Sequence, residues 1–176
     1  EKFTLDDDIK KIVYETFKKL YDDGLVYKAE RPVNWCTKHQ TTLSDLEIKH
    51  EERKDKLFYI RYQLENSSDC IVIATTRPET IPADVAIAVN PKSKWKNYIG
   101  KKVINPLTNE AIPVISDKRV EISFGTGALK ITPHHDALDF EIAKDHPELG
   151  ASKSVINKYG AIENSKTELN GLKILP

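Results

Sequence analysis

Apolar residues recur with two different periods along this chain. From residue 5 to residue 23 they follow helical spacing, at Ile9, Ile12, Val13, Phe17 and Leu20, which predicts one amphipathic helix. Beyond residue 55 they form short runs separated by turn-forming residues, at 56–64, 69–76, 85–89, 102–104, 111–115, 119–124 and 128–132. Such runs predict strands of a β-barrel or sandwich. A second helix is expected over 135–146 and a strand-turn element over 154–162.

Composition narrows the class of protein. The chain has 176 residues, of which 39% are hydrophobic, enough for the core of one domain. Its 27 basic and 27 acidic residues argue against a general polyanion binder and leave local contact with nucleic acid open. Two cysteines are too few for a disulfide scaffold and fit a reducing, cytoplasmic setting. The sequence contains no run of about 18 apolar residues, the length needed for a membrane-spanning helix. Because the chain begins without Met, we expect a domain of a larger protein.

Two polar clusters interrupt the strand pattern. The first is "TTRPET" at 75–80, where three hydroxyls and the guanidinium of Arg77 follow an apolar run. The second is "FGTGALKITPHHDALDFE" at 124–141, where Thr126 stands between two glycines that permit a tight backbone turn. Asp136 and Asp139 are one helical turn apart, so both carboxylates can share a face at the start of the second helix. These groups suit a small polar ligand.

Other chemistries fit these residues less well. His134 and His135 beside Asp136 suggest a metal, but their spacing matches no zinc signature, so we expect no metal site. Cys36 and His39 form only half of a metal motif, which favours a structural turn. No Gly-x-Ser-x-Gly elbow, P-loop or dinucleotide fingerprint is present. Water is therefore the expected attacking group. Each residue also has a structural alternative. Asp136 alone is equally consistent with a helix cap. Asp139 alone is consistent with a solvated acid in the first turn of the helix, and the histidines are consistent with structural roles.

The two clusters together resemble a known family. "TTRPET" followed by "GTGALKITPHHDALDFE" is similar to the editing domain inserted in the class I aminoacyl-tRNA synthetases for valine, isoleucine and leucine. The segments "NWCTKHQTTLSDLEI" and "ATTRPETIPADVAIAVNP" are most similar to the valyl type, although "PHHD" and "TIPAD" depart from it. The resemblance covers almost the whole chain. The HIGH and KMSKS signatures of ATP binding are absent, so this chain is not expected to activate an amino acid.

The resemblance implies a fold and an activity. It implies a closed six-stranded β-barrel over 36–176, preceded by a helix and connecting strand over 1–35. The implied reaction is hydrolysis of threonyl-tRNA(Val), and threonyl-adenylate is a further possible substrate. The alternatives are an isoleucyl-type domain that clears valyl-tRNA(Ile) and a module that only binds the tRNA end. No cofactor is implied for editing; ATP and Mg²⁺ would serve only the aminoacylation domain. The implied partners are the tRNA(Val) 3′-CCA end, the mischarged threonine and the rest of the synthetase chain.

Roles follow from the resemblance residue by residue. Asp139 would anchor the α-ammonium and Asp136 the threonine hydroxyl, and the two roles could be exchanged. Lys130 or the Thr-rich backbone would stabilise the oxyanion. The remaining expected substrate-binding residues are Thr75, Thr76, Arg77, Thr80, Thr126 and His135. The segment 92–102 has five lysines, and Lys94 and Lys96 are expected either to contact tRNA or to belong to a solvated loop.

Overall fold

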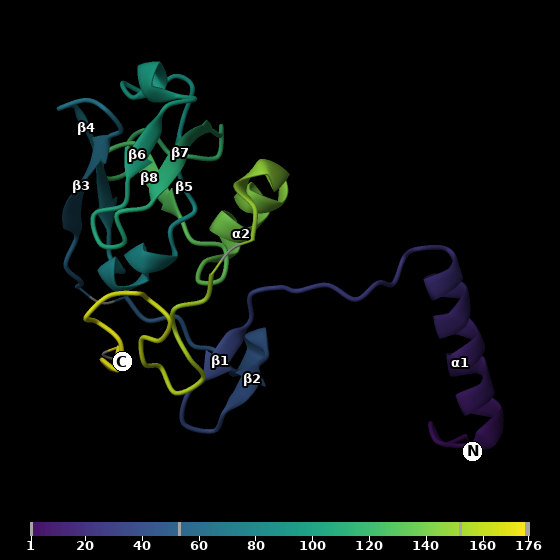
Figure 1. Ribbon diagram of the computed structural model, residues 1–176. Helices are drawn as coiled ribbons and strands as arrows, with labels where there is room; N and C mark the ends of the chain where they lie inside the picture. The colour runs from purple at the N-terminus through teal and green to yellow at the C-terminus, as the bar shows by residue number, and fades with distance from the viewer. Residues whose placement is uncertain (1, 53, 152, 175–176) are drawn as a thin grey trace. The chain divides into compact units, whose positions relative to one another are not determined.

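The computed structural model describes residues 2–52, 54–151 and 153–174 (Figure 1). The chain divides into two compact units, Glu1–Arg31 and Pro32–Pro176. This boundary lies a few residues before the division at 35/36 expected from the sequence. No helix among the described residues combines the length and the apolar character needed to cross a membrane.

The first unit contains the predicted amphipathic helix, α1 (Asp7–Asp22). Asp7 and Asp8 occupy its first turn and Lys19 its last turn, an arrangement that complements the helix dipole. The backbone leaves the helix at Gly24, whose φ of +72° is easily adopted by glycine. Most of its apolar side chains are exposed and none of its residues is buried, so the helical period is confirmed but its face buries no core within this unit.

The second unit is built on a six-stranded mixed sheet that almost closes on itself. Its strands are β3 (Phe58–Leu64), β4 (Cys70–Thr75), β5 (Ala86–Val89), β6 (Lys102–Ile104), β7 (Ala111–Ser116) and β8 (Ala128–Ile131). They follow the order β4-β3-β6-β7-β5-β8, and only the β5–β7 pair is parallel. The outer strands β4 and β8 also contact each other. The expected six-stranded barrel is therefore confirmed.

Side chains alternate between the two faces of this sheet. One cluster fills the barrel and includes Tyr62, Ile73 and Ile87. A second cluster lies on the other face, where Ile131 of β8 packs with Ile142 of helix α2 (Ala137–Lys144). Because alternate residues of a strand share a face, Lys130 points to the same side as Ala128, whose side chain belongs to the barrel interior. A lysine is thus directed into one end of the barrel.

Three segments differ from the sequence prediction. Residues 119–124 form turns and bends, not a strand, because only Val120 is buried while Ile122 and Phe124 are largely exposed. Residues 154–162 contribute isolated bridges such as Ile156 to Ile162. Strand β1 (Asn34–Cys36) pairs with β2 (Thr41–Leu43), a strand that the apolar pattern did not indicate.

The remaining elements are short helical turns. They are η1 (Asp45–Glu47), η2 (Pro78–Ala83), η3 (Lys96–Tyr98) and η4 (Pro147–Leu149). The turn between β1 and β2 follows Cys36, the last residue of β1, and contains His39, whose N–H donates to Cys36 Sγ at 3.4 Å. This contact supports the structural turn expected for the Cys-x-x-His segment.

Candidate functional site

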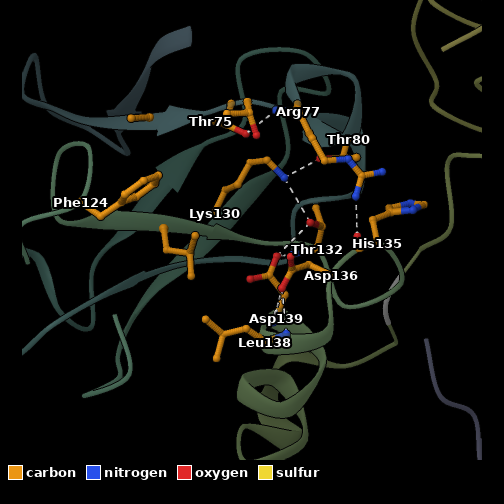
Figure 2. A pocket seen from close by; sticks show the side chains of 13 residues that line it. Thr75, Arg77, Thr80, Phe124, Lys130, Thr132, His135, Asp136, Leu138 and Asp139 are labelled. Carbon is orange, nitrogen blue, oxygen red and sulfur yellow. Dashed lines mark hydrogen bonds between the residues drawn. The ribbon is translucent and has the colours of Figure 1, made fainter. Parts of the chain in front are cut away.

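A cavity of about 270 Å³ lies where strand β4 leads into η2 and strand β8 leads toward α2 (Figure 2). The first polar cluster supplies Thr75, Thr76, Arg77 and Thr80, and the second supplies Lys130, His135, Asp136 and Asp139. The two clusters are about fifty residues apart in sequence, and the β4–β8 contact brings them together. The cavity thus has the two acids on one side and the threonines and arginine on another.

Asp139 is the buried acid of this cavity. Its side chain belongs to the first turn of α2, and the residue is 4% exposed. Its Oδ2 accepts hydrogen bonds from the N–H and the hydroxyl of Thr132, at 2.8 and 3.0 Å. Among the described residues Oδ1 accepts none. Burial raises the pKa of Asp139 to about 6, although the Thr132 N–H opposes the shift. A carboxylate with one free oxygen therefore faces the cavity.

Lys130 lies beside this acid. Its Nζ donates to the hydroxyls of Thr80 at 2.5 Å and Thr132 at 3.1 Å. Since an ammonium group has three donors, the third N–H makes no hydrogen bond to the described residues, although Nζ also lies 3.5 Å from Asp84 Oδ1. The residue is 6% exposed. A nearly buried cation with a free donor can bind a carbonyl oxygen or a developing oxyanion.

Asp136 does what a helix cap does. Its Oδ1 accepts from the backbone N–H groups of Leu138 at 2.8 Å and Asp139 at 3.1 Å. Its Oδ2 accepts no hydrogen bond within the described part of the chain, and the residue is exposed at the cavity rim. The capping role considered from the sequence is therefore present, and it leaves one oxygen for a ligand.

Arg77 and His135 are hydrogen-bonded to each other at the rim of the cavity. Arg77 Nη1 donates to the His135 carbonyl at 2.6 Å, and its Nε lies 3.4 Å from Glu79 Oε1. The Val155 N–H donates to His135 Nε2 at 3.1 Å. Burial, with the charge of Arg77 next in importance, lowers the pKa of His135 to about 4. A neutral imidazole whose Nε2 accepts this bond carries its proton on Nδ1, so it lacks a free lone pair for base catalysis. His135 fits a structural role.

The other expected residues lie at or beyond the rim. Thr126 does not line the cavity; its carbonyl accepts from Trp95 Nε1 at 2.8 Å. Gly125 and Gly127, which flank it, have φ of +57° and +72°, as expected for a tight turn. Lys94 and Lys96 are exposed, and Lys94 Nζ lies 4.8 Å from the centroid of the Trp95 ring, which is itself partly buried against the barrel core.

Sequence reasoning did not select several residues at this site. Phe124 and Leu138 line the cavity and give it an apolar side. Thr132 connects Lys130 to Asp139, and its position two residues after Lys130, immediately after the end of β8, was the available signal. The described residues contain no group of three His, Cys, Asp or Glu side chains arranged to hold a metal ion.

Comparison with known proteins identifies the class. Residues 1–161 match the family model of class I tRNA synthetases (I, L, M and V). The chain therefore belongs to the class I tRNA synthetase family.

The individual relatives are valine–tRNA ligases. That of Pseudothermotoga lettingae is 50% identical over 91% of this chain, and that of Clostridium tetani is 44% identical over 96%. The chain spans only about a fifth of their length, 19% and 21% respectively. A LeuRS chain from an Agrobacterium radiobacter K84 complex is 26% identical over 51% of this chain and 16% of its own, with a TM-score of 0.40, too distant to add to the assignment. The expected valyl-type segment of a synthetase is confirmed.

Proposed function

We propose that this segment hydrolyses the ester of mischarged threonyl-tRNA(Val) as the editing domain of a valyl-type synthetase. The observation that carries the proposal is the free Oδ1 of buried Asp139, which shares a cavity with Lys130 and the threonine and arginine wall. The family and the valine–tRNA ligase relatives support it. Editing is needed because a pocket built for valine rejects the nearly isosteric threonine only weakly.

Asp139 binds the α-ammonium of the mischarged residue. Thr132 holds Oδ2 with two hydrogen bonds, which directs Oδ1 toward the cavity without a competing donor from the described chain. A charge-assisted bond from an ammonium to this oxygen is stronger than a bond between neutral groups. Any aminoacyl ester carries this ammonium, so Asp139 accounts for affinity and not for the choice between threonine and valine.

Asp136 accounts for that choice. Its Oδ2 is free at the cavity rim while Oδ1 caps α2, so the helix itself fixes the side chain. The free oxygen accepts a hydrogen bond from the threonine hydroxyl, and valine has no group to donate one. A site built to bond a hydroxyl discriminates strongly against the analogue that lacks it.

Hydrolysis proceeds by direct attack of water. Water adds to the ester carbonyl carbon, the carbonyl oxygen gains negative charge, and the free N–H of Lys130 stabilises that charge. The bond to the ribose oxygen then breaks, which releases threonine and the free tRNA 3′ end. Because His135 is not available as a base, the neighbouring ribose hydroxyl of the substrate assists the water. The step requires no metal or cofactor.

The tRNA 3′-CCA end enters over the outer rim. The cavity has room for an amino acid and its ester link but not for the terminal adenosine as well. The adenosine therefore lies outside it. Lys94 and Lys96 are exposed near the loop that bears Phe124 and contact the tRNA backbone. The other partner is the rest of the synthetase chain, in the cytoplasm where tRNA is charged.

The test compares threonyl-tRNA(Val) with valyl-tRNA(Val) as substrates of the 176-residue chain. We expect release of threonine well above the spontaneous rate, little release of valine, and loss of the activity in Asp139→Ala. Glu141→Ala is the control, because Glu141 is an exposed acid on the same helix that does not line the cavity. No threonine release, or full activity in Asp139→Ala, contradicts the proposal; ester binding without release would indicate a binding module.

A further inference from the structure

A second buried carboxylate lies behind Lys130, outside the set of residues that line the cavity. Asp84 directly follows η2, and its side chain is fully buried. The Tyr62 hydroxyl donates a hydrogen bond to Asp84 Oδ2. Oδ1 lies 3.5 Å from Lys130 Nζ and is buried without a hydrogen-bond partner in the described chain. Tyr62 thus fixes one oxygen, and the other faces the lysine.

The balance of charge among Lys130, Asp139 and Asp84 suggests a function for the buried Asp84 carboxylate. Lys130 and Asp139 alone would form a neutral pair, joined through the Thr132 hydroxyl. A substrate ammonium that approached this pair would meet a carboxylate already balanced by a buried cation. When Asp84 is ionised, which burial delays until the pH exceeds its raised pKa of about 7, the three groups carry one net negative charge, which a substrate ammonium can neutralise. Buried charges that lack compensation are strongly disfavoured, so the balance matters more here than at the surface.

We propose that Asp84 is a positioning residue that acts as the counterion of Lys130 and thereby leaves Asp139 free to bind the substrate ammonium. The inference rests on the proposed function, because it assigns a cause to the affinity for an aminoacyl ester. Asp84 does not touch the substrate; it acts through Lys130. Its location on the barrel side of Lys130, hydrogen-bonded by a tyrosine of the core, keeps it away from the ligand.

The test measures binding of two probes to the 176-residue chain. One is a non-hydrolysable amide analogue of threonyl-adenosine, and the other is the same compound without the α-amino group. Asp84→Asn keeps the shape of the side chain and the Tyr62 contact. In this variant we expect the ammonium probe to bind at least about tenfold more weakly, which is the order of magnitude for the loss of one charge interaction in a partly buried site. The probe without the amino group should change by less than about twofold.

A double variant tests the charge argument itself. Asp84→Asn combined with Lys130→Met removes one negative and one positive charge, so the ammonium probe should bind the double variant more tightly than it binds Asp84→Asn alone. Asp117→Asn is the matched control, since Asp117 is a buried carboxylate paired with Arg119 that does not line the cavity. It should leave the affinity for both probes unchanged.

The possible failures are distinct. Equal loss of both probes in Asp84→Asn, or no loss of the ammonium probe, overturns the assignment of Asp84 while the proposed function stands. A double variant that binds no better than Asp84→Asn also overturns it. Absence of binding of either probe to the unmodified chain overturns the proposed function, and the inference with it.

Discussion

Thr132 donates two hydrogen bonds to a single oxygen of Asp139, from its backbone N–H at 2.8 Å and from its hydroxyl at 3.0 Å. The same hydroxyl accepts a bond from Lys130. One threonine therefore sets the orientation of the buried acid and connects it to the buried cation. The direction of donation runs from the lysine through the threonine to the acid, which leaves the outer oxygen of Asp139 for a ligand.

Thr132→Val should impair hydrolysis without disrupting the fold. Valine has nearly the shape of threonine and keeps the backbone N–H that donates to Asp139, but it has no hydroxyl to donate to Asp139 or to accept from Lys130. Loss of a hydrogen bond to a charged group is worth about 1.5–3 kcal/mol, so we expect the single-turnover rate of threonyl-tRNA(Val) hydrolysis to fall about tenfold or more. Thr42→Val, at an exposed position of β2, is the control. An unchanged rate in Thr132→Val would show that hydrolysis does not depend on the Thr132 hydroxyl that connects Lys130 to Asp139.

Substitutions of Asp136 should separate stability from selectivity. Serine at this position keeps an oxygen that caps α2, so the free energy of unfolding should stay within about 0.5 kcal/mol, whereas alanine should lower it by about 1 kcal/mol. Both variants lose the free Oδ2 and should lose the preference for threonyl over valyl esters. Chemical denaturation and competition between the two charged tRNAs provide the measurements. Retained preference in Asp136→Ser would assign the hydroxyl contact elsewhere.

The sequence predicted most of the barrel and part of the site. Short β-branched runs identify strands wherever each run finds a partner strand, and the two polar clusters contain Arg77, Lys130 and Asp139, which the fold brings to one cavity. Residues 119–124 have a strand-like composition but no partner, so local pattern alone was misleading. The Tyr62–Asp84 pair was also missed. A tyrosine in a strand looks like a core residue and an aspartate before a strand looks like a turn acid; only the fold joins positions 22 residues apart.

Affinity for the ammonium probe should decrease as the pH falls from 7 to 5, an interval in which the α-amino group of the probe is already charged. Burial raises the pKa of Asp139 to about 6 and that of Asp84 to about 7, so both carboxylates gain protons in this interval and the cavity loses negative charge. His135, with a pKa lowered to about 4, stays neutral throughout most of it. We expect the dissociation constant to rise by up to about tenfold per pH unit below pH 6. Isothermal titration calorimetry with the probe that lacks the amino group should give a nearly flat profile.

Asp84→Asn should change how stability depends on pH. The folded chain keeps the Asp84 proton up to about pH 7, while an ordinary aspartate loses it near 3.8, so this group makes the free energy of unfolding fall as the pH rises between those values. Asparagine removes the effect. The stability of the variant relative to the unmodified chain should therefore rise from pH 4 to pH 7, by at most about 1.4 kcal/mol per pH unit. Denaturant unfolding at several pH values measures the difference, and a constant difference would show that the fold does not raise the pKa of Asp84.

The glycine loop at the cavity rim should tolerate no side chain at Gly125. A Cβ atom built there would lie 2.7 Å from the Cβ of Ala74 in β4, and the φ of +57° adds backbone strain. Gly100→Ala is the matched control, since Gly100 has a φ of +82° in a tight turn and nothing lies within 4 Å of the new Cβ, so it should cost only about 1–2 kcal/mol. Gly125→Ala should lower the free energy of unfolding by about 1–3 kcal/mol beyond that control. Because Ala74→Gly removes the opposing methyl group, the double variant Ala74→Gly/Gly125→Ala should recover part of the loss. If the losses of unfolding free energy from the two substitutions are simply additive, the contact between Ala74 and the loop is not what excludes a side chain at Gly125.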